Sequence, residues 1–432
     1  MITSLSLPGR TAQGPTGLGH VRTIAATYFC AGLGRTLPAL VALSLVASGC
    51  ANRVQDVLQP LAVAPTDTSR VTMLVATTRK PSEDPGKLYS GDRGTAISLN
   101  SVDVSIPPDR NRKIGEVQWP SRMPPDPEKE FAVTQVAKVQ SEGQAFDWYR
   151  KNRNTKHQVI IFVHGFNNTY ADAVFRFAQI VHDSGTNAAP ILFTWPSRGR
   201  VFDYLYDKES ANYSRRALED LILQAAKSPD VSDVTILAHS MGGWLAAEAL
   251  RGVAMREKSI PTKVKNVVLA APDIDIDVFR RQFTEMGAKR PHFVILTSTR
   301  DKALEVSGWL SGGVNRLGGS DLRPYARLLD ELGVSVIDTS AIATNDPLGH
   351  NGFADSPEIV RLLGRRLAGQ SLEGGKTSVA DQIGMTAANF AGAAARVAVA
   401  TPVAVISPEA REILKRELSS DEGKIKDGQI SY

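Results

Sequence analysis

The stretch VTILAHSMGG, residues 234–243, decides the fold of this chain. VTILAH is an apolar run typical of a buried strand, and the Ala- and Leu-rich segment that follows predicts a helix over 242–255. Ser240 lies at the turn between them, with the small residues Ala238 and Gly242 two positions before and after it. A serine that only caps a helix would not need small residues on both sides. The pattern therefore predicts a nucleophile elbow, a sharp turn that presents the serine hydroxyl.

Strands and helices alternate on both sides of this turn. Strands are predicted at 159–163, 190–195, 234–239, 266–271, 292–297 and 334–339, with helices between them at 171–183, 210–227, 242–255 and 321–331. Such alternation indicates an α/β fold, with a mostly parallel central sheet and helices on both of its faces. VTMLVA (71–76) and VDVSI (102–106) come earlier and predict an N-terminal antiparallel extension of the sheet.

The loop after the first predicted parallel strand carries a second signal, His164-Gly165-Phe166. A serine nucleophile needs two backbone N–H groups that point at the negative charge developing on the substrate oxygen. One comes from the residue after the nucleophile, which is Met241, and the other comes from this loop. We therefore expect Met241 and Phe166 to form the oxyanion hole.

Composition excludes several other classes of function. The chain has 50 Lys and Arg against 45 Asp and Glu, scattered without a basic stripe, so nucleic acid is not an expected partner. Its two cysteines, Cys30 and Cys50, both precede the predicted strands, so cysteine chemistry is excluded from the body of the protein. Because zinc-protease, C-x-x-C and phosphate-loop motifs are absent from the sequence, we expect no metal and no cofactor.

Residues of about 70 to 366 resemble the α/β-hydrolase superfamily, in particular an uncharacterised bacterial branch often encoded as lipoproteins. The matching segments are VATTR (75–79), FVHGFNN (162–168), FTWPSRG (193–199), LAHSMGG (237–243), APDID (271–275), TSTRDKAL (297–304) and LGHNGF (348–353). The resemblance implies the α/β-hydrolase fold and hydrolytic chemistry, and it implies almost nothing about the physiological substrate.

The order of a catalytic triad in this fold is serine, acid, histidine. Only His292 and His350 follow Ser240, and His292 begins a strand at the wrong edge of the sheet, so His350 is the expected base. Two carboxylates follow strands at the correct edge, Asp273 and Asp301. Local chemistry does not separate them, whereas the order of elements in the superfamily favours Asp301 as the acid.

The sequence divides into four segments. Residues 1–50 have the layout of a signal peptide that ends at Cys50, and they resemble a lipoprotein signal in which that cysteine carries the lipid anchor. Residues 51–68 are expected to form a tether, and 69–368 the hydrolase domain. Residues 369–432 are Ala- and Gly-rich, and we expect this tail to be disordered.

Together these features predict a serine hydrolase in the bacterial cell envelope, anchored to the membrane by its N-terminal lipid and facing the periplasm. Its substrate is expected to be a small-molecule or lipid ester, or a thioester, that reacts through an acyl-enzyme. Residues 201–206 and the segment around Trp309 either wall the acyl pocket or pack as ordinary loop aromatics. The alternatives are an acyltransferase and a non-catalytic envelope binding protein on the same fold.

Overall fold

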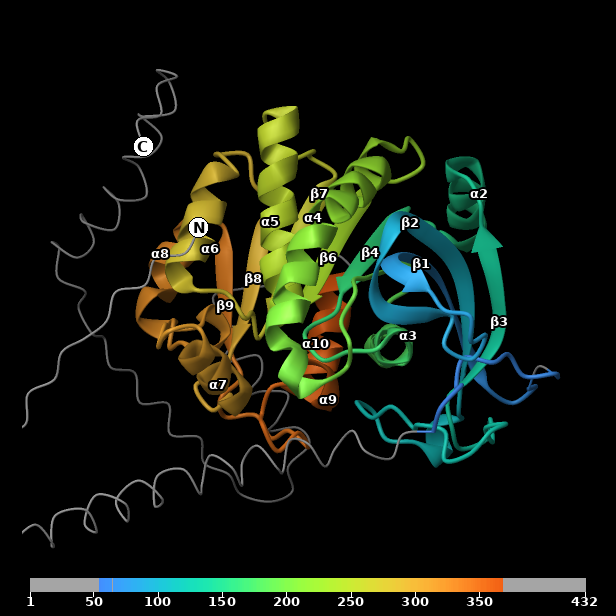
Figure 1. The fold of residues 1–432 in the computed structure, drawn as a ribbon. Coiled ribbons are helices and arrows are strands. Elements are labelled where there is room, and N and C mark those ends of the chain that lie inside the picture. The colour runs from blue at the N-terminus through green and yellow to red at the C-terminus, as the bar shows by residue number, and fades with distance from the viewer. Residues whose placement is uncertain (1–53, 64, 368–432) are drawn as a thin grey trace, which may run out of the picture. The chain divides into compact units, whose positions relative to one another are not determined.

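The computed structural model describes residues 54–63 and 65–367 (Figure 1). The expected signal segment with Cys50 and the expected tail at 369–432 lie outside these residues. Within the described part of the chain, none of the helices combines the length and the apolar character needed to cross a membrane.

The described residues form one nine-stranded sheet in the order β3-β2-β1-β5-β4-β6-β7-β8-β9. The strands are β1 (Ser69–Pro81), β2 (Tyr89–Ile106), β3 (Ala132–Val139), β4 (Gln158–Val163), β5 (Ala189–Thr194), β6 (Asp233–His239), β7 (Val264–Ala270), β8 (His292–Thr297) and β9 (Val334–Asp338). β2 pairs antiparallel with both β1 and β3, and the other pairings are parallel. This topology confirms the α/β-hydrolase fold with an N-terminal antiparallel extension.

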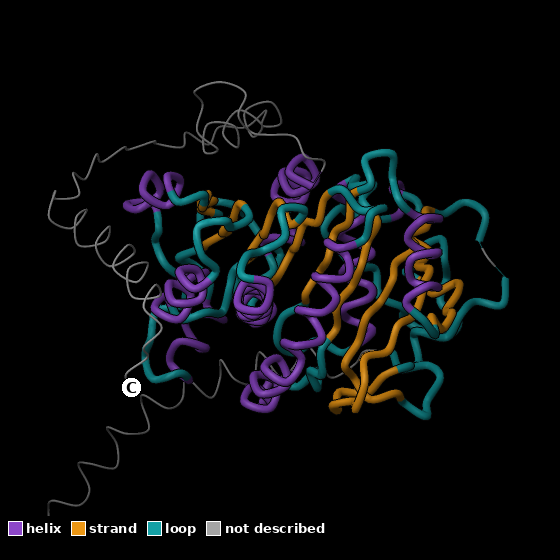
Figure 2. The backbone as a smooth tube through the Cα atoms, turned by 90° about the horizontal axis from the view of Figure 1, so that it is seen from above, coloured by secondary structure: helices purple, strands orange, loops and turns teal. Residues whose placement is uncertain are grey.

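Helices cover both faces of the sheet (Figure 2). One face is packed by α3 (Tyr170–Ser184), α9 (Gly352–Asp355) and α10 (Pro357–Leu367). The other face is packed by α2 (Glu142–Asn152), α4 (Tyr204–Lys227), α5 (Met241–Glu257), α6 (Ile276–Glu285) and α8 (Ala326–Glu331). Alternate residues of one strand point to opposite faces, so Met73 and Val75 lie in one half of the core, whereas Leu74 and Ala76 lie in the other.

The prediction from sequence missed part of the N-terminal antiparallel extension. It predicts neither β3 nor α2, and it predicts only the last five residues of β2, because polar and glycine residues make 89–101 look like a loop. The stretch expected to be a tether also differs, since Val57 and Leu58 are buried against the core under β1 and β2. This part of 51–68 therefore packs on the domain. The parallel strands agree with their predicted positions to within two residues.

The candidate site residues lie at the carboxyl ends of the parallel strands. The turn after β4 leads into α3, which begins with a capping box between Thr169 and Asp172. β6 runs into α5, β7 into α6, and β8 into α7 (Lys302–Leu310). Because these ends meet at one edge of the sheet, the four loops lie next to one another.

Candidate active site

Ser240 occupies the turn between β6 and α5 in a backbone conformation that non-glycine residues rarely adopt, with φ of 53° and ψ of −123°. Three hydrogen bonds hold it there: its N–H donates to Ala270 O (3.0 Å), and its carbonyl accepts from the N–H groups of Gly243 (2.9 Å) and Asp273 (3.0 Å). A Cβ atom on Gly242 would lie only 2.3 Å from the carbonyl oxygen of His164. The chain therefore needs glycine at 242 for the strand and helix to meet so closely.

Asp301 and His350 form a buried pair at this edge. Nδ1 of His350 lies 2.7 Å from Oδ2 of Asp301, whose side chain is fully buried. The other carboxylate oxygen, Oδ1, accepts the N–H of Leu304 and so caps the first turn of α7. Burial lowers the pKa of His350. The hydrogen bond that His350 donates to Asp301 and the charges of Asp301, Asp273 and Asp346 outweigh burial, and the net pKa is raised above its ordinary value of 6.5.

The loop that carries His350 is held by the carboxylate of Asp346 and by contacts with the ring of His239. Asp346 accepts the backbone N–H groups of Leu348, His350 and Asn351. The ring of His239, the residue before Ser240, lies 4.7 Å from the ring of His350 and stacks on Phe353 at 4.3 Å. The contact between the two histidine rings places the imidazole of His350 beside the residue that precedes Ser240.

Asp273, the second candidate acid, is bound elsewhere. Its Oδ2 accepts the hydroxyl of Tyr204 (2.9 Å), and its Oδ1 accepts the hydroxyl of Ser307 (2.5 Å). Nε of Arg316 lies 3.1 Å from Oδ1, within ion-pair range although its N–H does not point at that oxygen. The carboxylate of Asp273 is thus occupied by three partners of its own, and Asp301 is the acid that meets the imidazole.

The two residues expected to supply the oxyanion donors belong to segments that lie close to Ser240. Met241 is the first residue of α5, where backbone N–H groups have no partner within the helix. The loop after β4 approaches the serine so closely that a Cβ on Gly165 would lie 2.9 Å from Cβ of Ser240. Phe166 follows in this loop, and its ring meets the ring of Tyr204 edge-on at 5.3 Å.

Arg79 supports this loop, and the sequence analysis did not assign it a role. Its guanidinium is buried and donates to Thr194 Oγ1 (2.9 Å), Ser197 O (2.7 Å) and Asn168 O (2.7 Å). Burial lowers its pKa to about 10, against the raising effect of the nearby Asp207. The segments VATTR, FVHGFNN and FTWPSRG, which carry the family resemblance, are the only hint of this role in the sequence. Arg79 ends the first segment and hydrogen-bonds to residues of the other two.

His164 belongs to the same buried group. The N–H of Trp195 donates to its Nε2 (3.1 Å), so Nε2 is the unprotonated nitrogen, and Nδ1–H donates to Gly165 O (2.9 Å). Burial and the charge of Arg79 lower the pKa of His164 to about 3. The imidazole is therefore neutral and serves as a fixed brace for the loop, on which Asn168 also donates to Phe166 O.

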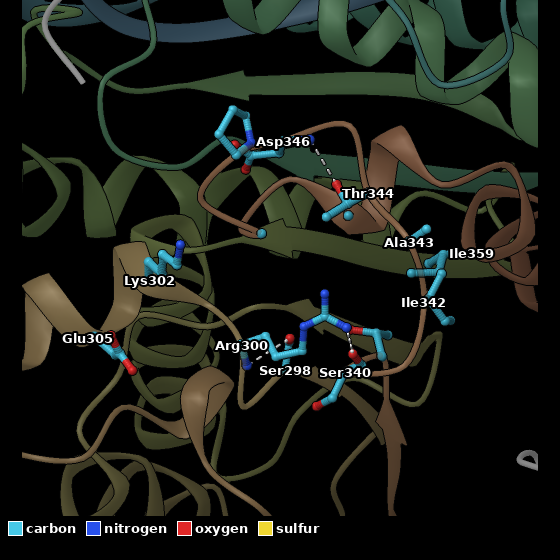
Figure 3. Close-up of a pocket in the computed structure, with 14 residues that line it drawn as sticks. Ser298, Arg300, Lys302, Glu305, Ser340, Ile342, Ala343, Thr344, Asp346 and Ile359 are labelled. Carbon is cyan, nitrogen blue, oxygen red and sulfur yellow. Dashed lines mark hydrogen bonds between the residues drawn. The ribbon is translucent and has the colours of Figure 1, made fainter. Parts of the chain in front are cut away.

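Two cavities lie near these residues. A cavity of about 60 Å³ is lined by Met241, Trp244, Tyr204 and Asp273 among others. A larger one of about 480 Å³ lies beside the His350 loop, where Arg300, Lys302 and Asp346 line it (Figure 3). Of the aromatic residues considered as pocket walls, Tyr204 lines the small cavity, whereas Phe202 and Trp309 are 78% and 76% exposed. Within 54–63 and 65–367, His, Cys, Asp and Glu form no group of three or more arranged to hold a metal ion.

Comparison with known proteins places the chain in a family. It is similar to an uncharacterised protein from Nostoc sp. (strain PCC 7120), with 28% identity over 176 residues, which cover 34% of this chain and 43% of the relative. Among solved structures it is similar to an esterase from Pyrobaculum calidifontis (14% identity, 63% of this chain and 81% of the esterase, TM-score 0.30). It is also similar to carboxyl esterase 2 from Tuber melanosporum (13% identity, 72% and 91% covered, TM-score 0.34). Residues 141–366 match the family described as alpha/beta hydrolase of unknown function (DUF900), and the chain therefore belongs to that family of the α/β-hydrolase superfamily.

Proposed function

We propose that this α/β hydrolase is a serine esterase that cleaves a carboxylic ester, a lipid ester or a thioester through an acyl-enzyme. The observation that carries the proposal is the 2.7 Å bond between Asp301 and His350, in a loop packed against the residue that precedes Ser240. A serine hydroxyl is a poor nucleophile until a base removes its proton, and a carboxylate on Nδ1 leaves Nε2 of the imidazole free to accept that proton.

In the proposed reaction, Nε2 of His350 takes the proton of Ser240 while Oγ bonds to the carbonyl carbon of the substrate. The carbonyl oxygen becomes an oxyanion, which the N–H groups of Phe166 and Met241 stabilise. The tetrahedral intermediate collapses, the bond to the leaving group breaks, and the imidazolium gives its proton to the departing oxygen or sulfur. Water then repeats the sequence on the acyl-enzyme and releases the acid and free Ser240.

A fluorophosphonate probe tests the serine and its base together. We expect the full-length protein to be labelled on Ser240, with labelling lost in Ser240→Ala and slowed by several powers of ten in His350→Ala. Both variants should keep the wild-type thermal transition, because neither residue belongs to the apolar core. Folded wild-type protein that remains unlabelled would favour a non-catalytic binding protein. If the protein is labelled but transfers the acyl group to an added alcohol faster than to water, the result would favour an acyltransferase.

We also propose that the hydrolase is a lipoprotein of the bacterial envelope, anchored by Cys50 and facing the periplasm. The support is the sequence of residues 1–50, which has the signal layout. Labelling cells with a radioactive fatty acid tests this proposal. We expect label in the wild-type protein and none in Cys50→Ala, and label retained in the variant would contradict it.

A further inference from the structure

His239 ends β6 directly before Ser240, and the proposed reaction gives it no task. Successive side chains of a strand point to opposite faces of the sheet, and Leu237 lies in the half of the core that α3, α9 and α10 cover. His239 therefore points to that face, where its ring stacks on Phe353 of α9 at 4.3 Å. Only 7% of His239 is exposed, and a buried imidazole needs a hydrogen-bond partner.

The partner of His239 is the backbone of the expected base. Nε2 of His239 lies 3.3 Å from the carbonyl oxygen of His350. A carbonyl oxygen can only accept, so Nε2 carries the proton and donates it. The two histidine rings also lie 4.7 Å apart. The residue that precedes the nucleophile therefore contacts both the backbone and the side chain of the residue that activates it.

His239 stays neutral in this position. Burial and the positive charge that His350 carries when protonated lower the pKa of His239 well below its ordinary value of 6.5. The other charged or titratable groups that act on the two rings are those of Asp273, Asp301, Asp346, Arg176 and His164. Replacing His239 with another neutral side chain changes no charge beside the base. An effect of such a replacement on the pKa of His350 must therefore come from a change in the position of its imidazole.

The hydrogen bond from His239 completes the hold on the backbone of His350. The N–H of His350 donates to Oδ2 of Asp346 (2.8 Å), and its carbonyl accepts from His239. Its ring is held separately by Asp301. Without the N–H of His239 the carbonyl loses this donor, and the imidazole can move away from Asp301 and from Ser240. A displacement of about 1 Å in a reacting group can cost about 100-fold in rate.

The opposite side of the His239 ring lies against a fixed helix. Phe353 belongs to α9, where the carboxylate of Asp355 accepts a hydrogen bond from Arg176 of α3 (2.9 Å). This bond joins α9 to a helix that packs on the sheet. Because Phe353 is held in this way, the ring of His239 is confined between it and His350.

We infer that His239 is a positioning residue for the base, which holds the backbone of His350 so that its imidazole stays between Asp301 and Ser240. The inference rests on the proposed function, because it takes His350 as the base. His239 and Ser240 are neighbours in the chain, so the end of β6 positions the nucleophile and the base together.

The variants His239→Met and His239→Gln of the full-length protein test the inference. Both remove the ring, and only glutamine keeps an N–H that reaches as far as Nε2. We expect His239→Met to lower kcat for p-nitrophenyl acetate by about 10- to 100-fold and to change KM by less than about threefold. His239→Gln should recover most of that loss.

The pH profile separates positioning from packing. A looser contact with Asp301 removes part of what raises the pKa of His350, so the acid limb of kcat/KM should move to lower pH in His239→Met. In His239→Gln the limb should stay near its wild-type position. His182→Met is the matched control, because His182 is half-buried on α3 and faces Asp109 and Asp183. It should leave kcat and the limb unchanged.

Phe353→Leu gives a second route, should the His239 variants fail to fold. It keeps an apolar side chain in the core, changes no charge and removes the ring that confines His239, so it should move the acid limb in the same direction. An unmoved limb in this variant would count against the inference.

Two further results would overturn the inference. One is a wild-type kcat and a wild-type acid limb in folded His239→Met. The other is an equal loss of kcat in His239→Met and His239→Gln with the limb unmoved, which would make His239 a packing residue only. Failure of the proposed function is a different outcome: it would appear as wild-type protein that is not labelled on Ser240 and does not hydrolyse the ester.

Discussion

Replacing Asp301 with asparagine should abolish most of the activity while it leaves the fold intact. The structure gives the reason, because the carboxylate has two tasks: Oδ1 accepts the N–H of Leu304 (3.0 Å) and Oδ2 accepts Nδ1–H of His350 (2.7 Å). In Asp301→Asn the single amide oxygen stays with the Leu304 N–H, which has no other acceptor at this helix start. The amide NH₂ then faces Nδ1 of His350 and selects the tautomer that carries its proton on Nε2. That nitrogen can no longer accept the proton of Ser240.

The expected loss is up to about 10⁴-fold in kcat, which corresponds to about 5 kcal/mol of transition-state stabilisation. The stability cost is smaller. Exchanging one charge-assisted hydrogen bond for a neutral one costs about 1.5–3 kcal/mol at most, since the cap on α7 is retained. The rate should therefore fall far more than the melting temperature does.

The matched variant is Asp273→Asn, a change of the same size at the other candidate acid. We expect at most about a tenfold loss of kcat, because Asp273 is not bonded to the imidazole. Its stability should fall more steeply, by about 3–5 kcal/mol, because Arg316 would keep a buried charge without its counter-ion. Both variants are compared by kcat for p-nitrophenyl acetate and by thermal unfolding. The reasoning is refuted if Asp273→Asn loses the activity and Asp301→Asn retains it.

Three further predictions concern the pH profile, the elbow and the oxyanion loop. The acid limb of kcat/KM, measured across about pH 5–9, should lie above pH 6.5, because the raised pKa of His350 keeps the base protonated and inactive to higher pH. Asp301→Asn should move that limb to lower pH. A limb that does not move would assign it to a group other than His350. Gly242→Ala should lower the free energy of unfolding by about 1–3 kcal/mol and reduce activity, since its Cβ would overlap the carbonyl of His164. Gly143→Ala on α2 is the control and should not destabilise the protein, because its Cβ would meet only Oγ of Ser141, at 3.8 Å. Equal melting temperatures of the two variants would contradict the turn geometry. Arg79→Lys should lower the stability of the protein and should lower kcat more than it raises KM, because one ammonium cannot replace the three divergent hydrogen bonds of the guanidinium. Wild-type kinetics in this variant would show that Arg79 does not support the oxyanion loop.

The parallel half of the fold could be predicted from sequence because its signals are local. Each buried strand is a continuous apolar run, and the elbow requires small residues at fixed positions around Ser240. β2 and β3 carry weaker signals. They lie at the outer part of the sheet, where polar residues alternate with apolar ones. The backbone pairing of β2 with β3 stabilises both strands, and that pairing is not visible in the local sequence pattern.

Some residues of the candidate site could likewise be predicted from the sequence, and others could not. Order along the chain singled out His350. Two carboxylates fitted the position of the acid, and the order of elements in the superfamily favoured Asp301. In the structure Asp301 bonds to the imidazole, whereas Asp273 pairs with Arg316. Arg79 is the extreme case. A buried arginine looks like an ordinary strand residue in sequence, because its hydrogen-bond acceptors lie about 90 to 120 positions further along the chain.

The place of β1 in the sheet bears on where this protein can be divided. The segment that matches the family begins at residue 141, after β1, β2 and β3. Yet β1 lies inside the sheet, between β2 and β5, and supplies the arginine that holds the loop beside Ser240. A recombinant fragment of 141–366 would leave the edge of β5 without its partner strand and open to aggregation, and it would leave Asn168 O and Ser197 O without the donor Arg79. The smallest unit worth expressing therefore begins before residue 57, and the segment that matches the family is only part of the domain that folds.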